Sequence, residues 1–261
     1  MKKIILSFLF LCLICSGCGK KQPKLDTLGT IIQRDKLIVG VRDDTAPFGF
    51  RDKNGNLTGY DIELAHIIAK GVLKDEKKVE FVPVTASNRI MKLNSGEVDF
   101  LIATMSITEQ RQQILDFSMP YHMAGQAILT NRTSKAVSLK DFEGKKLIIV
   151  FGSTSENNLR TNVPEIEVIG FKTYKDAFNA LKAGKAQGIV ADDTILYNLS
   201  RNDSSVKILP KRYSQEPYAV AFRKEKESVR LIREVDYIID NLKSTGKLNK
   251  MREKWNINRG F

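Results

Sequence analysis

Short apolar runs of strand length alternate with helical patterns along most of the chain. The runs at 36–41 (KLIVGV), 98–104 (VDFLIAT) and 146–151 (KLIIVF) have the length and composition of buried strands. The stretches at 60–72 and 174–184 carry apolar residues at helical spacing instead. This alternation predicts an α/β fold with largely parallel, buried sheets.

The chain also contains an internal repeat. Segments 93–104 (LNSGEVDFLIAT) and 181–192 (LKAGKAQGIVAD) each join a helix end, a glycine, a short turn and an apolar strand. A polar residue follows each apolar run, Thr104 in the first and Asp192 in the second. Because open α/β sheets bind ligands at the carboxyl ends of their strands, the repeat predicts two similar lobes with polar side chains at those ends.

The first residues have the layout of a secretory signal peptide. Two lysines precede an apolar run at 4–14 and the small-residue stretch CSGC. This run is too short for a membrane-spanning helix, which needs roughly 20 residues, so residues 1–17 are expected to be cleaved. The stretch CSGC resembles a bacterial lipoprotein cleavage box, which makes Cys18 the expected lipidation site and membrane anchor. Residues 18–36 are then expected to form a flexible tether.

Composition narrows the remaining function classes. All three cysteines, at positions 12, 15 and 18, lie in or next to this leader. No disulfide, thiolate metal site or cysteine nucleophile is therefore expected in the exported protein. The formal net charge is +12, but the basic residues are scattered without interleaved aromatics. This pattern indicates a solvated surface or attraction to anionic polymers and substrates, and no binding to nucleic acid.

Three motifs carry a resemblance to a known family. They are GYDIELA at 59–65, SITEQR at 106–111 and DFSMPY at 116–121. In this order they resemble the extracellular solute-binding proteins for polar amino acids, family 3, which serve ABC importers. The similarity covers about 37–255, and within the family the chain looks most like the glutamate/aspartate-binding branch.

The resemblance implies an α/β, two-lobed, periplasmic-binding-protein-like fold of type II, with two parallel-rich sheets joined by a two-strand hinge. Lobe 1 is expected at 37–121 plus 219–261, lobe 2 at 126–213, and the hinge at 122–125 and 214–218. A monomer is expected, which is the default for a delivery protein, and no cofactor or metal is expected. Such a protein closes around one amino acid and delivers it to a permease.

Arg111 and Asp192 are the expected anchors of the ligand. In the family, an arginine at the position of Arg111 forms a two-pronged pair with the ligand α-carboxylate, which suits a planar guanidinium better than a lysine. Asp192 falls where the family keeps the carboxylate that receives the α-ammonium. Arg111 could instead pair with Glu109 or Asp116. Asp192 could instead cap the following helix.

Hydroxyl groups and backbone amides are expected on both sides of the ligand. Thr104 and Ser106 lie at the end of one repeat strand, and Ser153 and Thr154 begin a helix in the other lobe. Helix N-termini present unpaired N–H groups and a partial positive charge, which favour a carboxylate. The alternatives are simple helix capping at Ser153 and Thr154 and a satisfied buried hydroxyl at Thr104.

Aromatic residues are expected to pack against the aliphatic part of the ligand. The resemblance implies this role for Tyr60 and, less strongly, for Phe48. Either residue could equally belong to the core, because an aromatic at a helix start often only packs.

Arg42 and Arg89 are expected to read the ligand side chain. Arg42 ends a strand and Arg89 begins a helix, both at positions where the glutamate/aspartate-binding relatives carry arginines. Three arginines against one aspartate leave a surplus of two positive charges, which suits a ligand of net charge −1, whereas neutral glutamine would leave a cation underpaired. Arg42 and Arg89 could instead be solvated or paired with the aspartates at 43 and 44.

The sequence therefore predicts the binding component of an ABC importer for glutamate or aspartate, lipid-anchored outside the cytoplasm. Glutamine or cystine is the alternative ligand. A dehydratase on the same fold is the competing class, but the two histidines, His66 and His122, lack triad or metal-ligand spacing. A sensor module is a third possibility, which would need a separate signalling partner.

Overall fold

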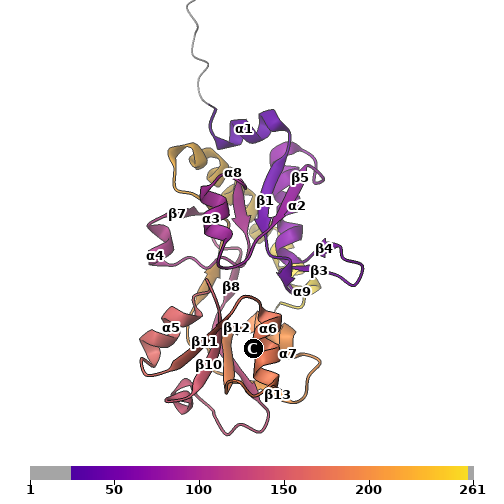
Figure 1. Cartoon of the computed structure of the whole chain (residues 1–261). Helices are drawn as coiled ribbons and strands as arrows, with labels where there is room; N and C mark the ends of the chain where they lie inside the picture. Colours follow the sequence, from indigo (N-terminus) through magenta and orange to yellow (C-terminus); the bar gives the residue numbers. More distant parts are fainter. Residues whose placement is uncertain (1–24, 258–261) are drawn as a thin grey trace, which may run out of the picture.

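Two five-stranded sheets form the framework of the protein, one in each of two lobes (Figure 1). The computed structural model describes residues 25–257. We call the lobe around the first sheet lobe 1 and the other lobe 2. Both sheets have the same strand arrangement, as the internal repeat predicts.

The sheet of lobe 1 has the order β5-β1-β6-β15-β7. Its β5, β1 and β6 run parallel, and β15 is antiparallel to both β6 and β7. The bounds are β1 Leu37–Val41, β5 Val79–Pro83, β6 Phe100–Ile102, β7 Leu115–Phe117 and β15 Ala221–Arg223.

The sheet of lobe 2 has the order β11-β10-β12-β9-β13. Its β11, β10 and β12 run parallel, and β9 is antiparallel to both β12 and β13. Each sheet is therefore mixed, with three parallel strands followed by two antiparallel steps. The bounds are β9 Gln126–Asn131, β10 Lys146–Val150, β11 Glu167–Phe171, β12 Gly188–Asp192 and β13 Val206–Ile208.

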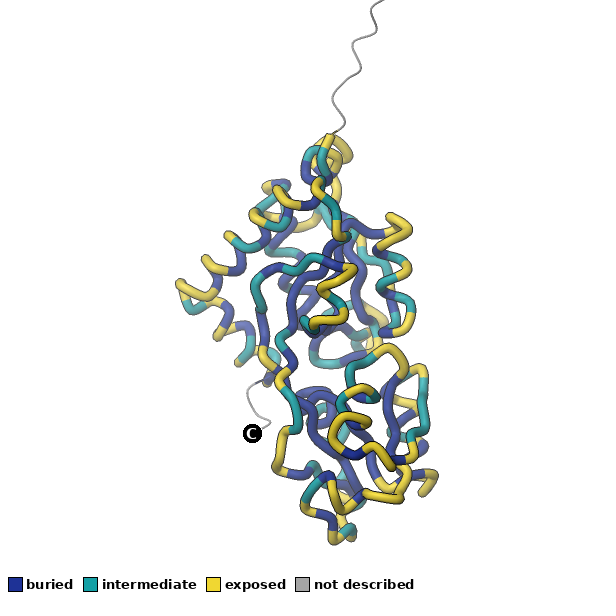
Figure 2. The backbone as a smooth tube through the Cα atoms, turned by 90° about the vertical axis from the view of Figure 1, so that its left-hand side faces the viewer, coloured by how far each residue is buried: buried dark blue, intermediate teal, exposed yellow. Residues whose placement is uncertain are grey.

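The apolar runs are continuous because both faces of each sheet are buried. In β10, Ile148 and Val150 pack into one core cluster, while Leu147 and Ile149 pack into another on the opposite face. Alternate strand residues point to opposite faces, so a strand covered on both sides needs apolar residues at every position. Figure 2 shows the buried strands running through the middle of both lobes.

Helices cover the sheets and place polar residues at the strand ends. Among residues 25–257, no helix is long and apolar enough to cross a membrane. The bounds are α2 Tyr60–Leu73, α3 Arg89–Asn94, α4 Glu109–Gln112, α5 Ser155–Asn162, α6 Tyr174–Lys182, α7 Asp193–Ser200, α8 Val229–Ser244 and α9 Lys247–Lys254, with 3-10 turns η1 Leu139–Phe142 and η2 Lys226–Ser228.

A two-stranded ladder connects the lobes. It pairs β8 (His122–Ala124) with β14 (Glu216–Tyr218) in antiparallel orientation, and β8 lies between the two sheets in Figure 1. The chain passes from this ladder into the sheet of lobe 1 between the end of β14 and the start of β15. The lobe and hinge boundaries expected from the sequence remain predictions. A small sheet of β2 (Asp44–Thr45), β3 (Gly49–Arg51) and β4 (Leu57–Thr58) follows β1.

Helix α1 (Thr27–Arg34) lies within residues 18–36, which were expected to form a flexible tether. That expectation is wrong for residues 27–34. The side chain of Asp26 accepts a hydrogen bond from the Gly29 N–H and so caps the helix. Leu28 and Ile31 are buried in the main core. Residues 27–34 are therefore part of lobe 1, because their apolar residues at helical spacing pack into its core. The predicted signal peptide (1–17) and lipidation site (Cys18) lie outside the described residues.

Helix α1 gives a first prediction. Ile31 is fully buried, whereas its neighbour Ile32 is 52% exposed. We expect Ile31→Ala to lower the free energy of unfolding by about 2–4 kcal/mol and Ile32→Ala to change it by no more than about 0.5 kcal/mol. Urea unfolding of the two variants, made from residue 20 onward, tests this; equal effects would show that α1 is not docked in solution.

Candidate functional site

An enclosed cavity lies between the lobes, at the carboxyl ends of strands from both sheets. The open space left inside it is only about 10 Å³, so the side chains of the two lobes nearly fill it. The lining residues are Arg42, Ala86, Arg89, Thr104, Ser106, Arg111, Ser153, Thr154, Tyr174 and Asp192.

This lining includes every residue expected at the site except the two aromatics, Tyr60 and Phe48. The side chains come together because β1, β6, β10 and β12 end at the cavity and the loops and helices after them carry the polar residues. Arg89 and Tyr174 join from the first positions of α3 and α6.

Two arginines of lobe 1 meet one carbonyl of lobe 2. Arg111 donates from Nη2 to the carbonyl oxygen of Gly152 at 3.1 Å, and Arg89 donates from Nη2 to the same oxygen at 3.2 Å. Arg111 also donates to the Ser106 carbonyl at 2.9 Å. It is thus neither paired with the acidic residues beside it nor solvated as an ordinary helix charge. Burial, the largest cause, lowers the pKa of Arg111, while Glu216 and Asp192 counteract that shift.

Gly152 allows this contact between the lobes. Its φ is +78°, and a Cβ on it would lie 2.4 Å from the carbonyl oxygen of Ala86. No other residue type fits a backbone that approaches the opposite lobe so closely at a positive φ.

Arg89 is held mainly by backbone. Its Nη1 donates to the carbonyls of Ala103 and Thr104 at 2.5 and 3.2 Å. Burial, followed by repulsion from Arg111 and Arg42, lowers the pKa of Arg89. Within residues 25–257, its buried Nε has no hydrogen-bond partner. A donor of this kind at a cavity wall is suited to an anionic group.

Arg42 is paired inside the protein. Its Nε and Nη2 both donate to Oδ1 of Asp44, at 2.9 and 2.6 Å, and the Arg42 side chain is 1% exposed. The guanidinium also lies over the ring of Tyr174, 5.8 Å from its centroid. The sequence left open that Arg42 pairs with a neighbouring aspartate, and the structure shows this pair with Asp44.

Asp192 lies at the end of β12 and is 8% exposed. The Tyr218 hydroxyl donates a hydrogen bond to it. Burial raises the pKa of Asp192 to about 7, with a further contribution from Glu216, while the Tyr218 hydrogen bond and Arg111 act in the opposite direction. Asp192 occupies the N-cap position of α7, but its side chain makes no capping hydrogen bond. The carboxylate is thus available at the cavity.

The hydroxyl residues have different roles. Thr104 has a φ of +48°, and its N–H donates to the buried Asp61 at 3.1 Å. Ser153 donates its hydroxyl to the Val150 carbonyl at 2.7 Å. Thr154 occupies the N-cap position of α5 without a capping hydrogen bond from its side chain. Simple capping therefore does not explain Thr154.

Tyr60 does not line the cavity, which corrects its expected role. It is fully buried, its hydroxyl donates to the Tyr121 carbonyl at 3.2 Å, and its ring packs edge-on against Phe48. The helix start directs both rings into the core of lobe 1. His122 packs in the same aromatic group and His66 packs against Phe81, so neither histidine lines the cavity.

Sequence reasoning missed four residues of the site: Tyr174 and Ala86 in the lining, and Asp61 and Tyr218 behind it. Asp61 lies inside the motif GYDIELA, and its position there was the available signal. Burial raises the pKa of Asp61 to about 7. No group of three or more His, Cys, Asp or Glu residues in the described part of the chain could hold a metal ion.

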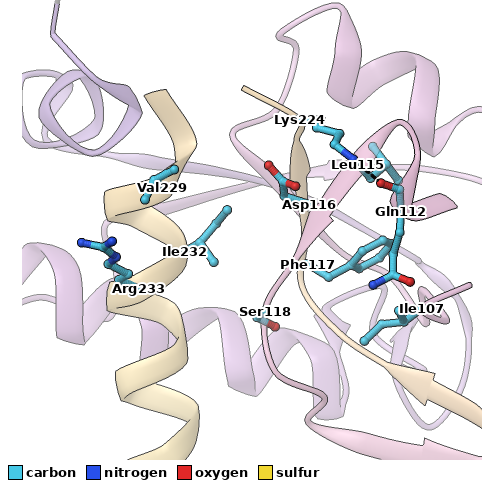
Figure 3. A pocket seen from close by; sticks show the side chains of 10 residues that line it. All are labelled: Ile107, Gln112, Leu115, Asp116, Phe117, Ser118, Lys224, Val229, Ile232 and Arg233. Atoms are coloured by element: carbon cyan, nitrogen blue, oxygen red, sulfur yellow. Dashed lines mark hydrogen bonds between the residues drawn. The ribbon is translucent and has the colours of Figure 1, made fainter. Parts of the chain in front are cut away.

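A larger, open groove lies elsewhere on lobe 1, between β7 and α8 (Figure 3). Val229 and Ile232 of α8 face the edge strand β7 across it, and Lys224 donates to the Gln112 carbonyl. None of the predicted site residues lines this groove. The cavity between the lobes is therefore the candidate site.

The chain is similar in sequence and fold to several known proteins. The chain matches the family model of bacterial extracellular solute-binding proteins, family 3, over residues 37–258. It is 37% identical to the ABC transporter glutamine-binding protein GlnH of Bacillus subtilis (strain 168), over 98% of this chain and 97% of the relative. It is 42% identical to a glutamine-binding protein of Geobacillus stearothermophilus, over 77% of each chain. A solved structure of an ancestral arginine-binding protein bound to glutamine is similar with a TM-score of 0.78 and 38% identity, over 85% of this chain and 98% of that one.

The hydrogen bond to Asp192 gives a prediction for the site. Because the Tyr218 hydroxyl lowers the pKa of Asp192, we expect Tyr218→Phe to raise that pKa further above about 7. Carboxyl-carbon NMR titration of the ligand-free protein measures it. Tyr60→Phe is the matched control, since its hydroxyl bonds to a backbone carbonyl, and it should leave the Asp192 titration in place. An unchanged or lower Asp192 pKa in Tyr218→Phe would contradict the assigned contact.

Proposed function

Since the chain belongs to the bacterial extracellular solute-binding proteins of family 3, we propose that it captures glutamine outside the cytoplasm for an ABC importer. The family establishes an extracytoplasmic amino-acid-binding component of such an importer. Its relatives are transport proteins and not enzymes, so the dehydratase alternative is not supported. The identity of the ligand is the proposed part.

The Arg42–Asp44 ion pair carries the choice of glutamine over an acidic amino acid. The sequence-based count of three arginines against one aspartate left a surplus of two positive charges. Asp44 removes one of these charges through its two hydrogen bonds to Arg42. Glu216, bonded to the cavity residue Thr154 at 2.9 Å, offsets another. A neutral, zwitterionic ligand then leaves the cavity balanced, whereas a ligand carboxylate at the side-chain end would need a free cation.

The remaining charges suit the two ends of an α-amino acid. Arg111 uses only part of its five N–H donors on the Ser106 and Gly152 carbonyls. Together with the unpartnered Nε of Arg89, it would bind the α-carboxylate. Asp192 would receive the α-ammonium. The side-chain amide then lies toward Arg42 and Tyr174.

Ligand binding would hold the lobes together. Arg111 belongs to lobe 1 and Asp192 to lobe 2, so only the closed arrangement satisfies both ends of the ligand. The close approach of Gly152 to Ala86 permits this arrangement.

The relatives support the same ligand. The two curated relatives compared above are named glutamine-binding proteins, and the similar ancestral structure holds glutamine. These names favour the glutamine alternative over the glutamate or aspartate first predicted from the sequence. Cystine remains the other candidate that the sequence raised.

Anchoring is proposed on the sequence alone. Cys18 would carry the lipid after removal of residues 1–17, and a monomer would deliver the ligand to the permease.

Titration calorimetry with glutamine, glutamate, aspartate, cystine and arginine tests the proposal. We expect the wild type to bind glutamine at least tenfold more tightly than glutamate. Asp44→Asn frees the Arg42 charge and should shift this ratio toward glutamate by tenfold or more, since about 1.4 kcal/mol corresponds to tenfold.

Asp43→Asn is the matched control. Asp43 pairs with the exposed Arg51 at 3.1 Å, so its loss should leave the ratio unchanged. Tighter binding of glutamate than glutamine by the wild type would overturn the proposed ligand. Equal effects of the two variants would show that Asp44 does not set the selectivity.

A further inference from the structure

The hinge strand β14 contains a buried carboxylate that the family resemblance did not point to. Glu216 is 3% exposed. It accepts hydrogen bonds from the Thr154 hydroxyl at 2.9 Å, the Asn158 amide at 2.9 Å and the Ser214 hydroxyl at 2.7 Å. All three donors are neutral, and no ion pair found among residues 25–257 includes Glu216. Burying a carboxylate that is bonded only to neutral donors costs free energy of folding, which suggests that Glu216 serves the function of the site.

Glu216 connects the hinge to the first turn of α5. Thr154 and Asn158 belong to that end of the helix, 62 and 58 residues away along the chain. The Thr154 hydroxyl also accepts a hydrogen bond from the Gln126 side chain at 2.7 Å. Since its one proton goes to Glu216, the hydroxyl has no proton left for a ligand. Glu216 therefore fixes the rotamer of Thr154.

A second residue of β14, Tyr218, contacts the other part of lobe 2 that would bind the ligand, the end of β12. Tyr218 follows Glu216 by two positions, and its hydroxyl donates to Asp192 at the end of β12. Alternate residues of a strand point to the same face. One face of β14 therefore holds both the start of α5 and the end of β12.

The charge of Glu216 also acts on the cavity. Besides burial, it contributes to the raised pKa of Asp192, and it counteracts the lowering of the pKa of Arg111. The other groups that act on Asp192 are Tyr218, Arg111, Tyr174 and Asp193. Arg212 forms an ion pair with Asp193, the residue after Asp192.

We propose that Glu216 is a positioning residue for ligand capture: it holds Thr154 and the start of α5 on the hinge strand, and it lies on the same face of β14 as Tyr218, the hydrogen-bond donor to Asp192, so that its negative charge acts on the carboxylate that would accept the ammonium group. The inference rests on the proposed function, since it concerns binding of an α-amino acid at Asp192. The hinge strand β14 would thus act directly on the affinity of the site for its ligand and on the pH dependence of that affinity.

The test compares the pH dependence of glutamine affinity in wild type and Glu216→Gln from pH 5.5 to 8.5. Asp192 must be ionised to pair with the ligand, so its proton is released on binding below its pKa of about 7. Wild-type affinity should therefore be constant above about pH 7 and fall by up to tenfold per pH unit below it. Removing the Glu216 charge lowers the pKa of Asp192, so the fall should begin at a lower pH in the variant.

At pH 8.5 the variant should bind glutamine about tenfold more weakly, because an amide oxygen replaces a charged acceptor. Thr154→Val separates the two roles, since it removes the hydroxyl and keeps the charge. It should weaken binding without moving the pH profile, and it keeps the inference testable if Glu216→Gln does not fold.

Asp99→Asn is the control for loss of a buried carboxylate. Asp99 is 8% exposed and bonds to Arg34 and to the Ile38 N–H in lobe 1. It should lower the melting temperature and leave the pH profile unchanged. A wild-type affinity and pH profile in Glu216→Gln would overturn this inference alone. Failure of the wild type to bind glutamine at any pH would instead overturn the proposed function.

Discussion

The carbonyl of Gly152 is the point at which the two lobes meet, and the site depends on it. Arg89 and Arg111 of lobe 1 both donate to this oxygen of lobe 2. The contact requires a glycine, because a Cβ would collide with Ala86. It also brings two cations together in a buried place, where repulsion between Arg89 and Arg111 lowers the pKa of Arg89. A closed cavity that concentrates positive charge in this way is suited to a carboxylate.

The proposed ligand depends on the anions next to these arginines. Arg42 is held by Asp44, and Glu216 lies behind Thr154. These two acids offset the surplus that a count of cavity residues alone suggests. The net charge of a buried site thus depends on the layer behind its lining as much as on the lining itself. For this chain, that layer is the basis for proposing a zwitterionic ligand over an amino acid with an acidic side chain.

Sequence patterns predicted the framework and most of the cavity for identifiable reasons. Strand length, apolar runs and glycine placement are local, so the ends of β6 and β12 could be located, and with them Thr104 and Asp192. The family motif then indicated Arg111. Helix α1 had local signals too, a capping Asp26 and apolar residues at helical spacing, which were attributed to a tether.

Other features were not predictable because they depend on partners far apart in the sequence. Nothing near Glu216 indicates that it bonds to Thr154, 62 residues away. The direction of the Tyr60 ring depends on the packing of Phe48 and Tyr121 around it. Asp43 and Asp44 are equivalent in sequence, and only the turn into β2 decides that Asp44 pairs with Arg42. The proposed ligand selectivity depends on which of these two aspartates pairs with Arg42.

A crystal structure of the complex with glutamine tests the central claim most directly. We expect the α-carboxylate on Arg111, the α-ammonium on Asp192, and both hydrogen bonds from Arg42 to Asp44 retained at 2.9 and 2.6 Å. Release of Arg42 from Asp44 to contact the ligand would contradict the account. Arg42 would then be a free cation of the site, and the surplus positive charge would again favour an acidic amino acid.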